Sequence, residues 1–343
     1  MELFKGFPAS SATPPLKVGI IGMGKMGRLR AGYIQRDPRM SLVAVCDIAD
    51  IPGLPEGVSV YHDYRELLQA DLDVVYACAV NWVLPDIVVA ALKSGRHVFC
   101  EKPPGRNADD VRRIMEEERL HPELRLWYGF NHRRHYSVMK ARTLINSGEF
   151  GELLWMRGAY GKCGGENFAS SWRNNRDLTG GGILLDQGIH LLDLFYYFGL
   201  GTAQIKSFVS TSHWKINAED NAFALLSDGR CHAMLHSSAT QWKHCFRLEI
   251  GLSKGFITLE GLNTGSRSYG EETITWGKSQ MAEDIPIAGR PIENREIFNT
   301  DDSWAWEQDE FARWILGQPP VNHASSQDAL KLMNAIGEIY RQL

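Results

Sequence analysis

The 343-residue chain lacks the features that mark several large classes of protein. It has no apolar run of the roughly eighteen residues that a membrane-spanning helix requires. It has no lysine- or arginine-rich stripe of the kind that binds nucleic acid, and its formal net charge is only −4. Its six cysteines are scattered without a CxxC pair, which is typical of free thiols in a reducing compartment. We therefore expect a cytoplasmic protein with neither a membrane nor a nucleic-acid partner.

The first fifteen residues lack the continuous apolar core of a signal peptide, so we expect a flexible leader over 1–15. The length favours two domains with separate cores. Because the pattern changes after Phe130, we expect one domain over 16–130 and a second domain over 131–343. The last helix of the second domain is expected to pack back on the first domain.

Short apolar runs alternate with helical periodicity up to Phe130, which predicts a doubly wound α/β domain with a parallel sheet. Beyond Phe130 the turns Asp228-Gly229 and Ser253-Lys254-Gly255 predict hairpins, hence antiparallel pairing in an α+β domain. The predicted strands are 16–22, 42–47, 58–61, 74–80, 97–100, 125–130, 153–160, 205–210, 221–227, 231–237, 246–251, 256–260 and 273–276. The predicted helices are 25–35, 85–94, 109–119, 136–146, 184–198, 304–316 and 327–343.

A glycine loop of the form GxGxxG, comprising Gly22, Met23, Gly24, Lys25, Met26 and Gly27, follows the first predicted strand and opens a helix. In that context Gly22 permits a tight turn, Gly24 permits close approach of a pyrophosphate, and Gly27 permits helix–strand packing. Lys25 and Met26 begin the helix, whose free N–H groups favour phosphate. The alternative is a glycine turn without a ligand.

Asp47 closes the second predicted strand, twenty residues beyond Gly27. A carboxylate at this position reaches the ribose hydroxyls of NAD and repels the 2′-phosphate of NADP. No arginine immediately follows it. We therefore expect NAD in preference to NADP; the alternative is that Asp47 only caps the next turn.

The fifth predicted strand runs into Glu101, Lys102, Pro103 and Pro104. Ligands of doubly wound sheets bind at the carboxyl ends of the strands, so Glu101 and Lys102 are expected at the cofactor, with Lys102 beside the nicotinamide. Its ammonium could hold a substrate hydroxyl and stabilise a developing alkoxide. The alternative is a solvated surface lysine.

A second polar group lies on the predicted helix 184–198, where Asp186, His190, Asp193 and Tyr197 share one stripe between apolar flanks. Such a stripe is costly to bury unless its groups pair or face a site. His190 suits proton transfer at neutral pH, and Asp186 could orient it. The alternatives are a structural histidine and a metal site, for which no third ligand at matching spacing is evident.

Together these elements resemble the Gfo/Idh/MocA family of oxidoreductases, over nearly the whole chain. The segments that carry the resemblance are the glycine loop, Glu101-Lys102-Pro103 and the Asp186-x-Gly188-x-His190 helix. The resemblance implies Lys102, Asp186 and His190 as the catalytic set, with His190 as general acid/base. It also implies that 16–130 is the NAD-binding Rossmann domain and 131–343 the substrate-binding and oligomerisation domain. The second domain would have an open, mainly antiparallel sheet whose outer face forms a homodimer or homotetramer.

The chain departs from the family pattern at two places. After the fourth predicted strand only Asn81 matches, so it is our one expected nicotinamide-side contact there. After the sixth, the run Asn131-His132-Arg133-Arg134 has a cation where the family has an aromatic residue. This favours a more anionic substrate, unless the run is only a solvated helix start.

For the substrate we expect contacts from Tyr160, Lys162, Trp172 and Arg173, which lie at or after a strand end and before the His190 helix. Tryptophan stacks on sugar rings, although it is more often a core or interface residue. The expected reaction is hydride transfer between NAD and a secondary hydroxyl of a sugar, nucleotide sugar or cyclic polyol. Alternatives are an NAD-dependent glycosidase that acts by transient oxidation and elimination, and a non-catalytic dinucleotide-binding regulator. No metal is expected.

Overall fold

The computed structural model describes residues 3–8, 14–280 and 291–341. The chain divides into two compact units. The first contains residues 2–130 and 304–334, and the second contains residues 131–303 and 335–343.

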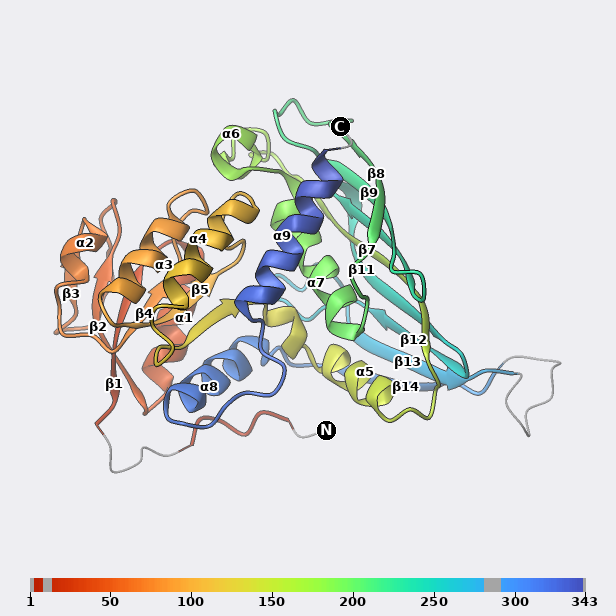
Figure 1. Ribbon diagram of the computed structural model, residues 1–343, viewed down its shortest axis with the longest axis horizontal. Helices are drawn as coiled ribbons and strands as arrows, with labels where there is room; N and C mark the ends of the chain where they lie inside the picture. The colour runs from red at the N-terminus through yellow and green to blue at the C-terminus, as the bar shows by residue number, and fades with distance from the viewer. Residues whose placement is uncertain (1–2, 9–13, 281–290, 342–343) are drawn as a thin grey trace. The chain divides into compact units, whose positions relative to one another are not determined.

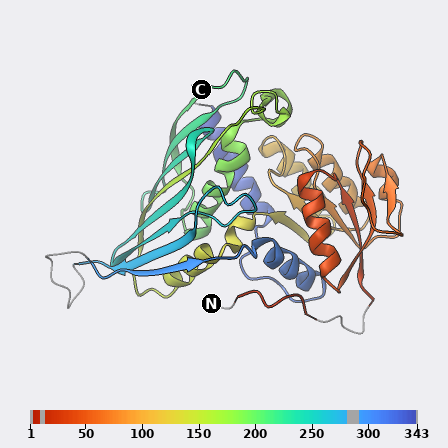
Figure 2. The same cartoon turned by 180° about the vertical axis from the view of Figure 1, so that it is seen from behind.

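The first unit is built on a six-stranded sheet in the order β3-β2-β1-β4-β5-β6, in which every neighbouring pair is parallel. This confirms the doubly wound fold, with the strand order reversing between β1 and β4. Figures 1 and 2, drawn from opposite sides, show α3 and α4 over one face of the sheet and α1 over the other. The strands are β1 Leu16–Ile21, β2 Met40–Cys46, β3 Ser59–Tyr61, β4 Val74–Ala77, β5 His97–Glu101 and β6 Leu126–Gly129, and the helices are α1 Lys25–Arg36, α2 Tyr64–Leu67, α3 Leu84–Lys93 and α4 Ala108–Glu118.

Helix α8 (Ser303–Ile315) completes the core of the first unit, although it follows the second unit in the sequence. Phe311 packs against Tyr76, Phe99 and Trp127, whose rings lie 5.5–6.1 Å away. The Tyr76 hydroxyl also donates to Gln308 at 2.7 Å. The domain division therefore differs from the continuous segment 131–343 expected above, because the apolar face of α8 covers this sheet.

Arg30 of α1 is fully buried in the first unit, where its charge is shared by two carboxylates. Its Nε donates to Glu101 at 2.7 Å and its Nη2 to Glu307 of α8 at 2.7 Å. Burial alone would lower the pKa of Arg30, but the two carboxylates outweigh it and raise that pKa, so the guanidinium stays charged. The group ties α1, β5 and α8 together.

The second unit is built on an eight-stranded sheet in the order β14-β13-β12-β11-β7-β10-β9-β8. Only β7 and β10 are parallel neighbours, which confirms a mainly antiparallel sheet. The two expected hairpins are also confirmed, since β9 pairs with β10 and β11 with β12. The strands are β7 Leu153–Cys163, β8 Gln204–Ser210, β9 Asn221–Ser227, β10 His232–Ser238, β11 Thr240–Leu252, β12 Gly255–Glu260, β13 Glu272–Lys278 and β14 Asn294–Phe298.

Helices cover one face of this sheet, because its inward side chains are apolar and buried, among them Leu235, Leu248, Ile257 and Ile274. Figure 1 shows α5 and α7 on that face. The helical elements of this unit are η1 Asn131–Arg134, α5 Tyr136–Asn146, η2 Trp172–Asn174, α6 Arg176–Thr179, η3 Leu184–Gly188 and α7 Ile189–Phe198, while α9 (Ser326–Tyr340) is divided between the units at Asn334.

Part of the expected leader, residues 1–2 and 9–13, lies outside the described residues. Within the described part, Phe4 makes an edge contact with Trp306 of α8 at 5.2 Å. All six cysteines are free thiols. Among the described residues, no helix is both long and apolar enough to cross a membrane.

Candidate active site

The glycine loop joins β1 to α1 and requires glycine at its first and third glycine positions. Gly22 has a φ of 94°, and a Cβ there would lie 2.6 Å from the carbonyl carbon of Cys78. A Cβ on Gly27 would lie 2.0 Å from the carbonyl oxygen of Gly22. The loop therefore folds back on the start of α1 and leaves no room for a side chain at Gly22 or Gly27.

Gly24 differs from these two glycines, because a Cβ built on it meets nothing within 4 Å. Gly24 is also the N-cap of α1, and no side chain caps the helix or places a negative charge in its first turn. The free N–H groups of this turn thus face open space beside a glycine. This cradle fits the pyrophosphate of a dinucleotide.

Asp47 follows β2 and accepts two backbone hydrogen bonds. Its Oδ2 accepts from the Met23 N–H at 2.6 Å, and its Oδ1 accepts from the Ala49 N–H at 3.1 Å. The carboxylate therefore caps its own turn and also holds the glycine loop. A carboxylate has about four acceptor positions, so two remain for ribose hydroxyls.

Lys102 and Asn81 follow neighbouring parallel strands at the same edge of the sheet as Gly22 and Asp47. Lys102 is half-buried and precedes a cis peptide bond to Pro103. Asn81 is buried in the turn before α3. Glu101, expected near the cofactor, is the buried ion-pair partner of Arg30. The first unit thus gathers the expected cofactor residues at one edge.

In the second unit, three successive glycines lead into the helix that carries His190. Gly180 has a φ of 85° and ends α6. A Cβ on Gly181 would lie 2.1 Å from the Tyr340 hydroxyl oxygen, and one on Gly182 would lie 2.3 Å from the backbone oxygen of Glu219. Gly181 and Gly182 therefore have no room for a side chain, because α9 and the backbone of Glu219 approach them closely.

The buried carboxylate of Glu219 anchors the beginning of the same helix. It accepts hydrogen bonds from the N–H groups of Gly182 and Leu184 at 2.8–2.9 Å and from the Tyr340 hydroxyl at 2.8 Å. Burial raises the pKa of Glu219, against the opposing effect of these donors. The first turn, Leu184–Gly188, is a π-helix, a rare form frequent at functional sites.

Every member of the predicted polar stripe has a partner in the second unit. Asp186 accepts from Lys162 Nζ at 2.8 Å, His190 stacks on His132, and Asp193 accepts from Arg133 Nε at 2.8 Å. The Tyr197 ring lies 5.1 Å beneath the Arg133 guanidinium carbon. The two carboxylates of the stripe are thus each neutralised by a cation, which lowers the cost of burying Asp193.

The run 131–134 is not the solvated helix start considered above. His132, Arg133 and Arg134 are all buried in η1. Arg133 is buried because Asp193 neutralises it and Tyr197 covers it. Arg134, the cation at the position where the family has an aromatic residue, is likewise part of the protein interior.

The sequence did not reveal that His132 is a neighbour of His190. Its ring is stacked on that of His190, with centroids 3.8 Å apart and planes inclined by 18°. Its Nε2 lies 3.2 Å from the Tyr160 hydroxyl, and its Nδ1 lies 3.2 Å from Asn131 Oδ1. The only indication in the sequence was its position next to Arg133.

Of the four expected substrate residues, the structure brings two to the polar stripe. Lys162 bonds Asp186, and Tyr160 contacts His132. Trp172 and Arg173 instead lie on η2 and contact each other, with the guanidinium carbon 4.4 Å from the indole centroid.

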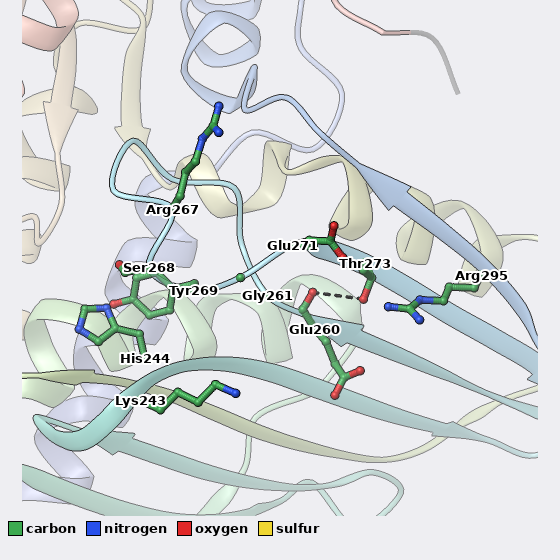
Figure 3. Close-up of a pocket in the computed structure, with 11 residues that line it drawn as sticks. Lys243, His244, Glu260, Gly261, Arg267, Ser268, Tyr269, Glu271, Thr273 and Arg295 are labelled. Carbon is green, nitrogen blue, oxygen red and sulfur yellow. Dashed lines mark hydrogen bonds between the residues drawn. The ribbon is translucent and has the colours of Figure 1, made fainter.

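A polar cavity of about 400 Å³ lies in the second unit, at the end of the sheet near Tyr160 (Figure 3). Tyr269 forms part of its wall, and its ring also lies 5.4 Å from that of Tyr160. Gln187 Nε2 donates to the Tyr269 hydroxyl at 2.7 Å. The other lining residues are Lys243, His244, Glu260, Gly261, Arg267, Ser268, Gly270, Glu271, Thr273 and Arg295. Among the described residues, no three His, Cys, Asp or Glu side chains are grouped as a metal site.

Two family models match the chain. Residues 16–130 match the model described as "Oxidoreductase family, NAD-binding Rossmann fold", and residues 138–258 match the GFO/IDH/MocA C-terminal domain. The two matches correspond to one segment in each unit and together cover more than half of the chain.

Characterised relatives match part of the chain. The D-glucoside 3-dehydrogenase of Escherichia coli K12 is 33% identical over 62% of this chain and 61% of its own length. An inositol 2-dehydrogenase of Salmonella paratyphi B is 32% identical over 42% of this chain and 46% of its own. The chain thus aligns with less than two thirds of each relative. A levoglucosan dehydrogenase solved with NADH has the same fold, with a TM-score of 0.81, 19% identity and coverage of 96% and 97%.

The open space at Gly24 leads to a prediction. Gly24→Ala should fold normally, because its Cβ meets no atom of the protein, yet weaken NADH binding by roughly tenfold or more because the methyl group fills the pyrophosphate cradle. The measurement is a fluorescence titration with NADH.

Gly32→Ala is the matched control, since its Cβ on α1 also meets nothing within 4 Å. It should leave NADH affinity unchanged and stabilise the helix by up to about 1 kcal/mol. Equal NADH affinity in Gly24→Ala and Gly32→Ala would refute a pyrophosphate at this loop.

Proposed function

The chain belongs to the Gfo/Idh/MocA family of oxidoreductases, and on that premise we propose that it transfers a hydride between NAD and a secondary hydroxyl of a sugar or cyclic polyol. The observation that carries the proposal is the stripe of Asp186, His190 and Asp193, in which the buried His190 has an ion-paired carboxylate one turn before it and another one turn after it. An open glycine cradle in the other unit supports the choice of cofactor.

The residues proposed to hold NAD are Gly22, Gly24, Lys25, Met26 and Gly27 at the pyrophosphate, Asp47 at the adenosine ribose, and Asn81 and Lys102 toward the nicotinamide. Glu101 contributes through its ion pair with Arg30, which fixes the end of β5. When bound, NAD supplies the hydride acceptor, which no amino-acid side chain provides.

The remaining steps fall to the side chains of the chain. His190 removes the proton of the substrate hydroxyl as the carbon loses its hydride. Lys102 holds the same oxygen and stabilises its developing charge. Asp186 and Lys162 form a pair that can exchange a partner with a substrate hydroxyl, because each keeps about a quarter of its side chain exposed. Tyr160, Trp172 and Arg173 are the further residues proposed to contact substrate.

The proposed role of His190 as the general base leads to a direct prediction. His190→Gln should lower kcat by about 10²–10⁴-fold, the usual contribution of a positioned acid/base, while NADH affinity changes less than twofold. Lys102→Met should lower kcat/KM to a similar degree. His213→Asn, at an exposed histidine, is the control and should retain full activity.

A substrate panel decides between the candidate activities. Inositols, free sugars, glycosides and nucleotide sugars are each incubated with NAD, and NADH and free sugar are measured. Formation of NADH that depends on His190 supports the dehydrogenase. Cleavage of a glycoside without net NADH would instead indicate the glycosidase. If the His190→Gln and Lys102→Met variants behave as wild type throughout, the enzyme proposal is refuted.

The preference for NAD over NADP rests on the position of Asp47. Wild type should use NAD at least about tenfold more efficiently, because the carboxylate repels a 2′-phosphate. Asp47→Asn should reduce the ratio of the two kcat/KM values toward unity, while Asp71→Asn, at an exposed carboxylate paired with Lys17, leaves it unchanged. A wild-type ratio that favours NADP would refute the assignment.

We also propose that the outer face of the second sheet forms a homo-oligomer. Phe208, Phe223, Leu225 and Met234 are 84%, 47%, 58% and 41% exposed on β8, β9 and β10. Their strand register places Phe208 beside Phe223 and Leu225 beside Met234, which gives an apolar patch of the kind that marks interfaces.

In light scattering, the wild type should therefore have the mass of a dimer or tetramer. Leu225→Glu should give monomers, because the new charge would be buried without a partner. Leu120→Glu, at an exposed leucine just past the end of α4, should not change the mass. A monomeric wild type would contradict the proposal.

A further inference from the structure

The ring stacked on His190 belongs to a hydrogen-bond chain whose direction can be assigned. At one end, Asp301 is a carboxylate, which only accepts. The Ser303 hydroxyl lies 2.6 Å from it and must donate its single proton there. Ser303 Oγ therefore accepts from Asn131 Nδ2, at 3.0 Å.

The amide orientation of Asn131 follows from that bond. With its NH2 group toward Ser303, its carbonyl oxygen faces His132 Nδ1 at 3.2 Å. An amide oxygen can only accept, so His132 Nδ1 carries a proton. The Nε2 of the neutral ring is then an acceptor, and the Tyr160 hydroxyl lies 3.2 Å from it. Burial raises the pKa of Tyr160 well above its ordinary value, so this hydroxyl keeps its proton.

The charges around His132 disfavour a second proton on its ring. His190 of α7 lies face to face at 3.8 Å, and two protonated rings at that distance would repel each other strongly. His135, at the start of α5, lies edge-on at 5.2 Å and bonds the buried carboxylate of Glu272 on β13 at 2.8 Å. The neighbouring Arg133 is neutralised by Asp193 of α7.

The surroundings of His135 are consistent with this arrangement. Burial by itself would raise the pKa of Glu272, but the interactions with His135 and Ser137 lower it, so Glu272 is a carboxylate. His132 thus lies between His190 and His135, and a positive charge on His135 is compensated by Glu272. Its own partners in the chain, an amide oxygen and a phenol, are both neutral.

We propose that His132 is a positioning residue: it is held neutral in its Nδ1–H form and offers its π face to His190, which it stabilises in the protonated state. This deepens the proposed function, because His190 must take a proton while its substrate is oxidised. A neutral aromatic face attracts a cation above it, and the attraction is larger in a desolvated site.

Two substitutions separate the π face from the hydrogen bonds. His132→Phe and His132→Leu both remove the bonds to Asn131 and Tyr160, but only phenylalanine retains an aromatic face. His190 in the leucine variant should titrate about one pH unit lower than in the phenylalanine variant. Since the base must be neutral to act, the acid limb of the kcat/KM profile should shift by the same amount to lower pH.

The closing experiment is nitrogen-15 NMR of the full chain labelled at histidine, titrated from about pH 5.5 to 9. The His132 and His190 signals are assigned with the His132→Phe and His190→Gln variants. We expect His132 to show a protonated Nδ1 and an unprotonated Nε2 while His190 titrates. A His132 imidazolium that forms before that of His190, or an Nε2–H tautomer, would overturn the proposal.

This readout is independent of turnover. If no substrate is oxidised but His132 has the expected tautomer, the proposed function fails and the assignment of His132 stands. If the two His132 variants give the same His190 titration within about 0.2 pH units, the stabilising role of the face is refuted even in an active enzyme. Should both variants fail to fold, the wild-type tautomer still decides.

Discussion

The constraint on which the second unit depends is that a largely buried helix carries charged and polar side chains in one stripe. Its carboxylates have to meet cations, because an unpaired buried charge would cost several kcal/mol. Lys162 and Arg133 supply those cations, from β7 and η1, and His132 of η1 stacks on His190. The contacts that allow this helix to be buried therefore also surround His190, so stability and chemistry have a common origin here.

Most of the fold was predictable because its signals are local. The parallel strands of the first unit read as apolar runs, and the hairpins at Asp228-Gly229 and Ser253–Gly255 have their own turn chemistry. Strand β14 was not predicted, since Asn294–Phe298 is short and largely exposed. The place of α8 was also missed, because its packing on Tyr76 is a contact between residues 232 positions apart.

For the site, the sequence indicated which residues matter but not what they touch. The stripe of Asp186, His190 and Asp193 follows from helical spacing, whereas the π-helical first turn and the His132 stack depend on tertiary packing. The three glycines before the helix were visible in the sequence, but the sequence did not show why glycine is needed there. Two of them leave space for Tyr340 and the Glu219 backbone, which come from distant segments.

The late position of α8 in the chain has a consequence for synthesis on the ribosome. Arg30 and Glu101 emerge early, but Glu307, the second carboxylate on that guanidinium, follows 277 residues after Arg30. Until then the nascent dinucleotide-binding unit has an uncovered apolar surface around Tyr76, Phe99 and Trp127, where Phe311 later packs. Residues 131–303 of the second unit are translated in the meantime. An apolar surface that is exposed for so long is open to aggregation and to chaperone binding until α8 arrives.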